Sequence, residues 1–401
     1  MQVPLELRCA TESDLRNWTG PEYLFWFYFN RNLPYDPVRP WVDHDGRWYA
    51  TISADGCNNT VPCGAGGAEF LYSSPALRGP TANWQLIGPM FVSNWTVLTP
   101  YKPASLLNEE FVTADYFGYL TGDPRGGATR CLLNNLFIFG GTTTYFCGTQ
   151  QPGKQFIVNY SDPAATGMID WGVFGDDGTG TPGIAGLTPN KGGTYMMART
   201  LSPQSPNQVA APGRKIITAW INGNGGTAQA LPRDLSLDPE TGELLQAFSP
   251  ELQLLRLPSK ARGDSNTLPR SGQLEIYAQF AVAPTADPAR HFGLLLQQAD
   301  DGTAALELTI DRKMQRVKLG GREGPLLAYP APHDLEFDVH VIVDHVLVTV
   351  IVNNRTAITA LSSPQSESST LFDVVGVDDV DTTLVRPLQA WALRDAETVD
   401  A

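Results

Sequence analysis

The segment YDPVRPWVDHDGRWYATISADG, residues 35–56, contains the clearest structural signal in this sequence. Within it the pair Asp36-Pro37 precedes Trp41 and an Asp-Gly turn, and an alternating run follows that turn. A turn dipeptide flanked by β-rich alternation is the strongest local signal for a β-hairpin. The Asp36 carboxylate stands just before this hairpin, among aromatic residues and near Arg39, as in many carbohydrate sites. The structural alternative is that Asp36 caps the hairpin ahead of Trp41.

The composition indicates a globular, β-rich protein. The chain has 401 residues, enough for two domains that each have a core. Hydrophobic residues make up 42% and charged residues 17%, which is ordinary for a folded protein. The 38 glycines, 31 prolines and 10% aromatic residues favour short strands joined by tight turns over long helices.

The charge and the residue spacing argue against several classes of partner. A formal net charge of −14 argues against nucleic acid, because phosphate binding needs a basic surface. No run of about 18 apolar residues occurs, so no membrane span is expected. The histidines and cysteines have no metal-binding spacing, so we expect no metal site. The sequence does not determine the oligomeric state.

Weaker patterns bear on location and on disulfides. The N-terminus has no basic start and no apolar signal core. Several Asn-x-Ser/Thr triplets nevertheless favour, slightly, a glycoprotein of the secretory route with an extracellular or vacuolar location. Cys57 and Cys63 bracket a short loop and form either a local disulfide or a pair of buried thiols. The triplets start at Asn17, Asn58, Asn94, Asn159 and Asn354.

The first half of the chain contains a repeated pattern. Residues 12–18 are echoed by residues 73–84, and both copies end on an Asn-Trp pair. Strand-like runs recur between and after them with a period of roughly 50 residues, which is typical of propeller blades. A β-sandwich with accidental similarity between loops is the alternative. The predicted strands are 48–53, 68–73, 136–139, 144–148, 196–200 and 215–221.

The pattern changes near residue 260. Residues 260–270 are polar and contain Gly263, Asp264 and Pro269, so they are predicted to form a linker. Period-2 strands follow and predict a sandwich of two antiparallel sheets. These strands are 273–282, 292–298, 304–310, 336–344 and 346–353.

Six segments, taken in order, are shared with one known family. They are Asp36-Pro37 with Trp41, Ile169-Asp170-Trp171-Gly172, residues 213–221, 231–237 and 250–256, and Val343-Asp344 with Val352-Asn353, Arg355 and Thr359. Together they resemble glycoside hydrolase family 32, the invertase and fructosidase family, over nearly the whole chain. The resemblance implies an all-β fold: a five-bladed β-propeller with an incomplete first blade, followed by a C-terminal β-sandwich. The implied parts are 1–257 for the propeller, 258–270 for a linker and 271–398 for the sandwich.

The resemblance also implies a chemistry. Members of the family hydrolyse or transfer β-fructofuranosyl groups of sucrose or fructans with retention and without a cofactor. Retention needs a carboxylate nucleophile and a carboxylic acid roughly 5–5.5 Å apart. The family's nucleophile lies in an Asn-Asp-Pro-Asn-Gly-like segment, and nothing like it precedes Glu12. Either the sequence is truncated at its N-terminus or the protein lacks the nucleophile.

The acid/base motif of the family is altered. Its Glu-Cys-Pro-Asp-like segment resembles residues 112–117, where Val112 stands at the glutamate position and Asp115-Tyr116 is retained. Glu110 lies just upstream, and a small bulge could bring it to the sugar. The alternative is a solvated acidic turn.

The remaining site residues follow from the same resemblance. Asp36 matches an aspartate that stabilises the transition state through sugar hydroxyls. Tyr35 stands in place of the family's arginine, and Arg39 could supply the lost charge. Trp41, Trp171 and Tyr116 form either a stacking floor for a sugar or part of the core. Asp115 is expected near the substrate, and Asp170 either binds it or holds a turn.

Three functions remain open at this point. The first is an enzyme that hydrolyses or transfers β-fructofuranosyl groups, and the second is a non-catalytic carbohydrate-binding protein that retains Asp36. The third is a structural or partner-binding protein. The whole-chain resemblance favours the first, whereas the altered acid/base motif favours the second.

Overall fold

The chain is almost entirely β-structure, as the sequence predicts. The computed structural model describes residues 2–7, 22–28, 34–54, 68–92, 112–136, 142–171, 194–202, 213–223, 226–262, 271–299, 301–362, 371–378 and 381–394. Short 3-10 helices, η3 (Pro163–Ala165) and η5 (Pro250–Leu255), interrupt the strands. No helix among these residues is long and apolar enough to cross a membrane.

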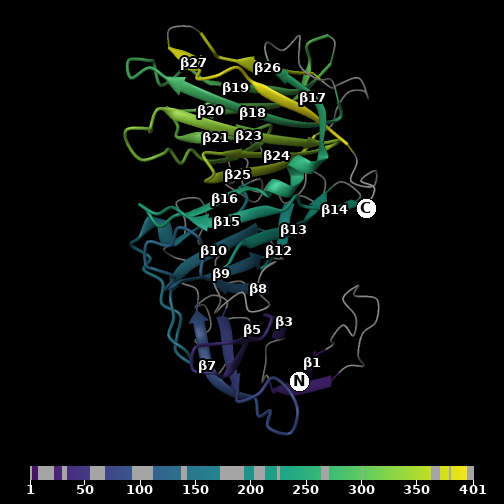
Figure 1. Cartoon of the computed structure of the whole chain (residues 1–401), viewed down its shortest axis with the longest axis vertical. Coiled ribbons are helices and arrows are strands. Elements are labelled where there is room, and N and C mark those ends of the chain that lie inside the picture. Colours follow the sequence, from purple (N-terminus) through teal and green to yellow (C-terminus); the bar gives the residue numbers. More distant parts are fainter. Residues whose placement is uncertain are drawn as a thin grey trace.

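Antiparallel sheets follow one another along the N-terminal part of the chain (Figure 1). The first pairs β1 (Gln2–Leu7) with β2 (Glu22–Tyr28). The next, called the β3–β7 sheet, has the order β3-β5-β6-β7, and β4 adds to β5. Its strands are β3 (Pro34–Pro37), β4 (Trp41–Val42), β5 (Trp48–Ala54), β6 (Ala68–Ser74) and β7 (Gln85–Val92).

Two further sheets repeat this arrangement. The β8–β11 sheet contains β8 (Val112–Gly118), β9 (Thr129–Leu136), β10 (Thr142–Thr149) and β11 (Thr166–Met168) in chain order. The β12–β16 sheet has the order β12-β13-β15-β16, and β14 pairs with β13. Its strands are β12 (Thr194–Leu201), β13 (Lys215–Gly223), β14 (Gly226–Gln229), β15 (Arg233–Leu237) and β16 (Leu244–Phe248). Such meanders of short strands are the form of propeller blades.

Two larger sheets form the C-terminal sandwich. The first has the order β17-β28-β18-β23-β24-β25 with β27 on β18, and the second has the order β22-β21-β20-β19-β26. The strands are β17 (Arg256–Arg262), β18 (Gln273–Val282), β19 (Phe292–Gln298), β20 (Ala304–Asp311), β21 (Arg316–Leu319), β22 (Arg322–Pro325), β23 (Glu336–Asp344), β24 (Leu347–Val352), β25 (Thr356–Leu361), β26 (Leu371–Val375), β27 (Thr382–Leu384) and β28 (Gln389–Leu393).

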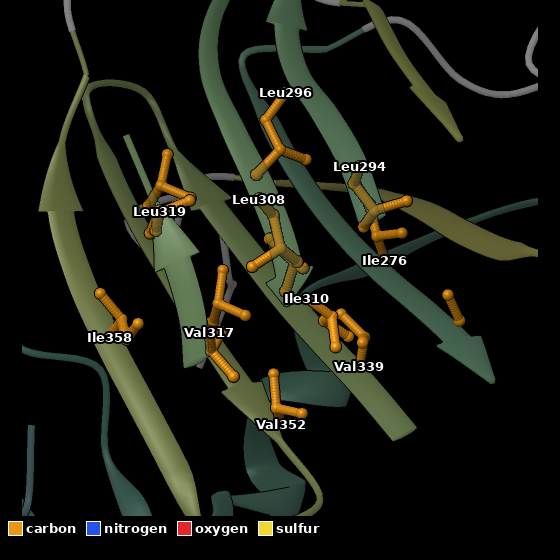
Figure 2. Packing of buried hydrophobic residues seen from close by; sticks show 14 of the residues in the cluster. Ile276, Leu294, Leu296, Leu308, Ile310, Val317, Leu319, Val339, Val352 and Ile358 are labelled. Atoms are coloured by element: carbon orange, nitrogen blue, oxygen red, sulfur yellow. The ribbon is translucent and has the colours of Figure 1, made fainter. Parts of the chain in front are cut away.

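Alternating side chains build the sandwich core. Along β23, Phe337, Val339 and Val341 are buried, while the residues between them face outward. Leu294, Leu308 and other apolar side chains from both sheets fill the space between the sheets (Figure 2). Each fully buried side chain of this size contributes about 1.5–3 kcal/mol relative to an exposed one, so this core is the main source of the sandwich's stability.

Direct hydrogen bonds attach the sandwich to the preceding sheets. The Trp171 amide donates to the Ala357 carbonyl at 2.8 Å, and the Gln246 amide donates to the Asn354 carbonyl at 2.7 Å. Arg355 Nε donates to Glu243 Oε2 at 2.8 Å. These contacts join β25 and the turn before it to the ends of the β8–β11 and β12–β16 sheets.

Some boundaries differ from the predicted ones. The strand β9 was predicted only at its last residue, because Arg130 and the Asn134-Asn135 pair break the alternating pattern. Residues 258–262 belong to β17, which pairs with β28, so this strand extends into the predicted linker. The number of five blades stays a prediction, since several segments between the N-terminal sheets lie outside the described residues.

Candidate functional site

The first strands of three successive sheets gather together. Strand β8 contacts β3 and β5 on one side and β12 on the other. Each first strand carries a one-residue register shift near its start: between Pro34 and Pro37 in β3, between Val112 and Asp115 in β8, and between Met196 and Arg199 in β12. Such bulges re-aim side chains and are frequent next to active sites.

Asp36 lies within the first of these bulges. Pro34 pairs with Ala54 and Pro37 with Ile52, so Tyr35 and Asp36 stand together opposite the single residue Ser53. The side chain of Asp36 lies outside the described residues. The side chain of Arg39, just after β3, is exposed to solvent. Two roles stay predictions: the binding of sugar hydroxyls by Asp36, and the replacement by Arg39 of the positive charge that is lost where Tyr35 stands in place of an arginine.

The predicted aromatic floor is packed inside the molecule. The rings of Trp41 and Tyr116 lie 5.1 Å apart between centroids, and the two residues are 2% and 0% exposed. Tyr116 Oη donates a hydrogen bond to Gln150 Oε1, and burial raises the pKa of Tyr116. The structure therefore brings Trp41 and Tyr116 together between the β3–β7 and β8–β11 sheets. Their contact with a sugar stays a prediction.

The altered acid/base segment forms the start of β8. Glu110 lies outside the described residues. Val112, at the position of the family's glutamate, pairs with Asn135 at the first position of the strand. The bulge that follows occupies residues 113–114, which is downstream of Glu110 rather than at it.

Asp115 faces the neighbouring β12–β16 sheet. Its Oδ2 accepts hydrogen bonds from the Thr200 amide at 2.5 Å and the Thr200 hydroxyl at 2.7 Å. Burial raises the pKa of Asp115, while the Arg199 guanidinium and the bonds from Thr200 act in the opposite direction. Asp115 is 2% exposed. Its hydrogen bonds to Thr200 join the β8–β11 sheet to the β12–β16 sheet.

A second buried carboxyl, Glu69, was missed by the sequence analysis. Glu69 pairs with Ser53 across β5 and β6, and Ser53 Oγ donates to Glu69 Oε1. Its Oε2 is buried and has no hydrogen-bond partner in the described part of the chain. Burial raises the pKa of Glu69 to about 7, against lowering effects of Ser53, Thr51 and Arg199.

Arg199 links these two carboxyls. It belongs to β12, and its Nη1 donates to the Ala114 carbonyl of β8. Its positive charge lowers the pKa of both Glu69 and Asp115. We call Glu69, Asp115 and Arg199 the central polar cluster. Hydrogen bonds of Asp115 and Arg199 join β8 to β12, and the charge of Arg199 extends the cluster electrostatically to Glu69 in the β3–β7 sheet.

Asp170 and Trp171 lie elsewhere, at the joint with the sandwich. Asp170 Oδ1 accepts the Thr359 amide at 2.9 Å, and Oδ2 accepts Arg233 Nη2 at 2.8 Å. Trp171 is 9% exposed and packs in the sandwich core against Gly324. Whether either residue also contacts a substrate stays a prediction.

A disulfide that was not predicted, Cys131–Cys147, joins paired positions of β9 and β10. The predicted Cys57–Cys63 pair lies outside the described residues. Within the described ranges, no group of His, Cys, Asp or Glu side chains is arranged to hold a metal ion.

Comparisons with known proteins bear on the fold. No protein-family model and no curated protein matches this sequence. A variant of fructan 1-exohydrolase IIa from Cichorium intybus in complex with 1-kestose matches with a TM-score of 0.67 and 14% identity, over 98% of this chain and 79% of that chain. A β-fructofuranosidase from Aspergillus kawachii matches with a TM-score of 0.65 and 14% identity, over 92% and 72%. A GH32 β-fructofuranosidase from Bombyx mori matches with a TM-score of 0.60 and 14% identity, over 98% and 76%.

These similarities confirm the predicted fold class. The chain has the all-β fold of the fructan exohydrolases and β-fructofuranosidases, a propeller followed by a β-sandwich. At identities near 14% the likeness concerns the fold alone.

Proposed function

We propose that this protein acts on β-fructofuranosyl groups of sucrose or fructans as a glycoside hydrolase-like protein. The observation that carries the proposal is the fold match over 98% of the chain to a fructan exohydrolase in complex with 1-kestose. The position of Asp36 in a bulge at the start of β3 supports a site at this end of the gathered first strands.

Asp36 is the residue that we expect to bind the sugar. A carboxylate that accepts hydrogen bonds from ring hydroxyls contributes most when the ring becomes oxocarbenium-like, because those bonds strengthen in the transition state. Arg39 supplies a nearby positive charge. Hydrolysis or transfer with retention also needs an acid and a nucleophile. Glu110 is the candidate acid, and we assign no residue of this chain as the nucleophile.

A second candidate function is binding without catalysis. Val112 stands where the related acid/base motif has its glutamate, and a valine side chain cannot transfer a proton. Glu69 and Asp115 are 0% and 2% exposed, and their described hydrogen bonds include those from Ser53 and Thr200. This observation favours a protein that recognises fructosyl groups and leaves them intact.

One experiment separates the two functions. The purified 401-residue chain is incubated with sucrose, 1-kestose and inulin, and fructose release and calorimetric binding are measured in parallel. Asp36→Ala is the test variant, and Asp301→Ala in an exposed sandwich turn is the matched control.

The enzyme function predicts fructose release that Asp36→Ala abolishes and Asp301→Ala preserves. The binding function predicts heat of binding without release, with the same dependence on Asp36. If none of the three sugars binds or reacts, the proposal is wrong and a structural or partner-binding role remains.

The Cys131–Cys147 disulfide supports the expected secretory route, with an extracellular or vacuolar location, because disulfides persist mainly in oxidising compartments. Localisation of the tagged protein in its own cells, with and without a block of secretion, tests this point.

A further inference from the structure

A pocket of about 690 Å³ lies between the β3–β7 and β8–β11 sheets, at the edge away from Asp36. It is lined by the turn before β5, the turn between β8 and β9, and the segment after β10. Asp36 lies in β3 and Val112 is the first residue of β8, whereas Tyr119 follows the end of β8. Tyr119 lies seven positions after Val112, which is about 23 Å of chain at about 3.3 Å per residue of strand. The pocket is therefore distinct from the proposed fructosyl site.

The pocket wall is cationic in an acidic protein. Its ionisable lining includes His44, Arg130 and Lys154, and no Asp or Glu lines it among the described residues. The chain as a whole has a formal net charge of −14. Two carboxylates of the turn before β5 are engaged locally: Asp45 accepts hydrogen bonds from Tyr49 Oη and the Arg47 amide, and Asp43 accepts the His44 amide.

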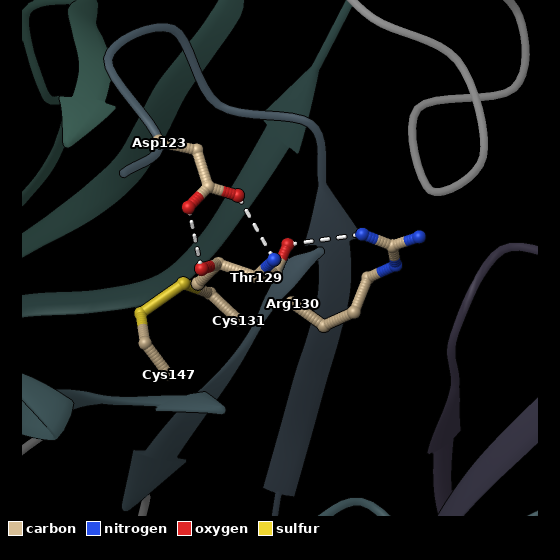
Figure 3. Close-up of a disulfide and its surroundings, with 5 residues drawn as sticks. All are labelled: Asp123, Thr129, Arg130, Cys131 and Cys147. Carbon is tan, nitrogen blue, oxygen red and sulfur yellow. Dashed lines mark hydrogen bonds between the residues drawn. A yellow bond between two sulfur atoms is a disulfide. The ribbon is translucent and has the colours of Figure 1, made fainter. Parts of the chain in front are cut away.

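Arg130 is built into the floor of this pocket. It is 6% exposed, and its side chain leaves β9 on the face opposite Cys131 (Figure 3). Its Nη1 donates to the Gly127 and Thr129 carbonyls at 2.7 and 3.1 Å. These two bonds hold the guanidinium at the pocket, where it can present a fixed positive charge.

Tyr119 forms a second fixed wall. Its φ of 54° is in the left-handed region, which is a costly conformation for a bulky residue and is concentrated at functional sites. Arg130 lies over its ring at 4.4 Å, and its hydroxyl shares a hydrogen bond with His44 Nε2. Gly127 has no side chain to collide with the ring, since a Cβ there would lie 3.0 Å from it.

Amide groups complete the lining. Gln150 Nε2 donates to the Lys154 carbonyl at 2.8 Å and its Oε1 accepts from Tyr116, which fixes the turn that carries Lys154. Gln151 and Gln155 also line the pocket. Amides that both donate and accept suit sugar hydroxyls, and the volume suits a ligand of monosaccharide to disaccharide size.

We propose that this pocket binds a hydroxylated organic anion, a sugar that carries a phosphate or a carboxylate. The anionic group pairs with Arg130 and Lys154, and the amides of Gln151 and Gln155 bind hydroxyls. Arg130 supplies the desolvated, preorganised contact, and Lys154 supplies an exposed charge at the mouth. This site does not depend on the proposed activity toward fructosyl groups.

The test uses the full chain and calorimetry with glucose 6-phosphate, glucuronate, glucose and inorganic phosphate. Lys154→Glu and Gln155→Glu are the test variants, because both side chains are exposed and folding should survive their replacement. Lys313→Glu, an exposed lysine in the sandwich, is the matched control for charge. Asp36→Ala tests independence from the fructosyl site.

We expect at least one of the two sugar anions to bind, and to bind less tightly as salt is raised. Lys154→Glu should weaken that binding about tenfold or more, and Gln155→Glu should also weaken it. Lys313→Glu and Asp36→Ala should leave it unchanged. If glucose 6-phosphate binds more tightly than glucuronate, the anionic group of the ligand is a phosphate. If glucuronate binds more tightly, it is a carboxylate.

Four results would overturn the proposal: no binding of either anion, equal binding of neutral glucose, inorganic phosphate binding as tightly as glucose 6-phosphate, or an affinity that Lys154→Glu leaves intact.

Discussion

At the scale of single residues, Glu69 is a buried carboxylic acid that we expect to titrate near neutral pH. Burial raises its pKa from 4.5 to about 7. An acid whose pKa is higher in the folded state favours folding fully below its unfolded pKa and loses that contribution as pH rises through its folded pKa. As pH rises from 4.5 to 7, the free energy of unfolding therefore falls progressively, by about 3 kcal/mol in total, because of Glu69.

The variant Glu69→Gln tests this expectation. A neutral amide imitates the protonated acid, so the variant should match the wild type near pH 5 and exceed it in stability near pH 8. Urea unfolding across this range measures the difference. Glu307→Gln, at an exposed position of β20, is the control and should follow the wild type. Parallel curves for wild type and Glu69→Gln would show that Glu69 stays ionised.

Glu69 also shows why part of the candidate site could not be predicted from sequence. A glutamate within the strand AEFLYSS suggests a solvent-facing position, but every residue of β6 is buried because both faces of the sheet are covered. Arg199 gave no signal either, since its bond to Ala114 of β8 and its electrostatic effect on Glu69 of β6 join strands far apart in the chain. Asp36, by contrast, could be found because its motif is local.

At the scale of elements, alternation predicted the sandwich strands closely. The predicted ranges 273–282, 292–298 and 336–344 coincide with β18, β19 and β23. These strands have a strict apolar stripe because one face of each packs in a single core. Strand β9 was mostly missed because its polar Arg130 is buried at the pocket while Cys131 and Leu133 fill another core.

The Cys131–Cys147 disulfide links the paired strands β9 and β10 and closes a loop with a sequence separation of 16 residues. Constraining a loop of about this length in the unfolded chain is worth about 3 kcal/mol. We expect Cys131→Ala/Cys147→Ala to lower the free energy of unfolding by a similar amount, measured by urea unfolding.

Reduction supplies the internal control for this prediction. Wild-type protein unfolded in dithiothreitol should fall to the stability of the double variant. A reductant effect that persists in the double variant would report a second disulfide, which is one of the two alternatives for Cys57 and Cys63. If the double variant is as stable as the oxidised wild type, the disulfide does not stabilise this sheet.

At the scale of the whole molecule, a buried ion pair joins the propeller part to the sandwich. Asp170 and Arg233 are each 1% exposed and 2.8 Å apart, and both bind Thr359 of β25. Arg322 of β22 brings a second buried cation near Asp170, and burial lowers its pKa. Three segments far apart in the sequence thus meet around one carboxylate.

Removing Asp170 should destabilise the entire chain. Asp170→Ala leaves buried guanidinium groups without their counter-charge, which costs about 3–5 kcal/mol. Arg233→Ala should cost a comparable amount, and the double variant should cost clearly less than the sum, because the two residues act as one unit. Urea unfolding in the absence of sugar measures all three.

The control for this cycle is Arg290→Ala, which breaks an exposed pair with Asp378 and Asp381 and should cost about 1 kcal/mol or less. Because no sugar is present, a role of Asp170 confined to substrate binding predicts no loss at all. Additive losses from Asp170→Ala and Arg233→Ala would mean that the pair does not couple the sandwich to the sheets before it. A large, non-additive loss would instead make Asp170 a structural residue of the joint, and would restrict the search for sugar contacts to the end of the gathered first strands where Asp36 lies.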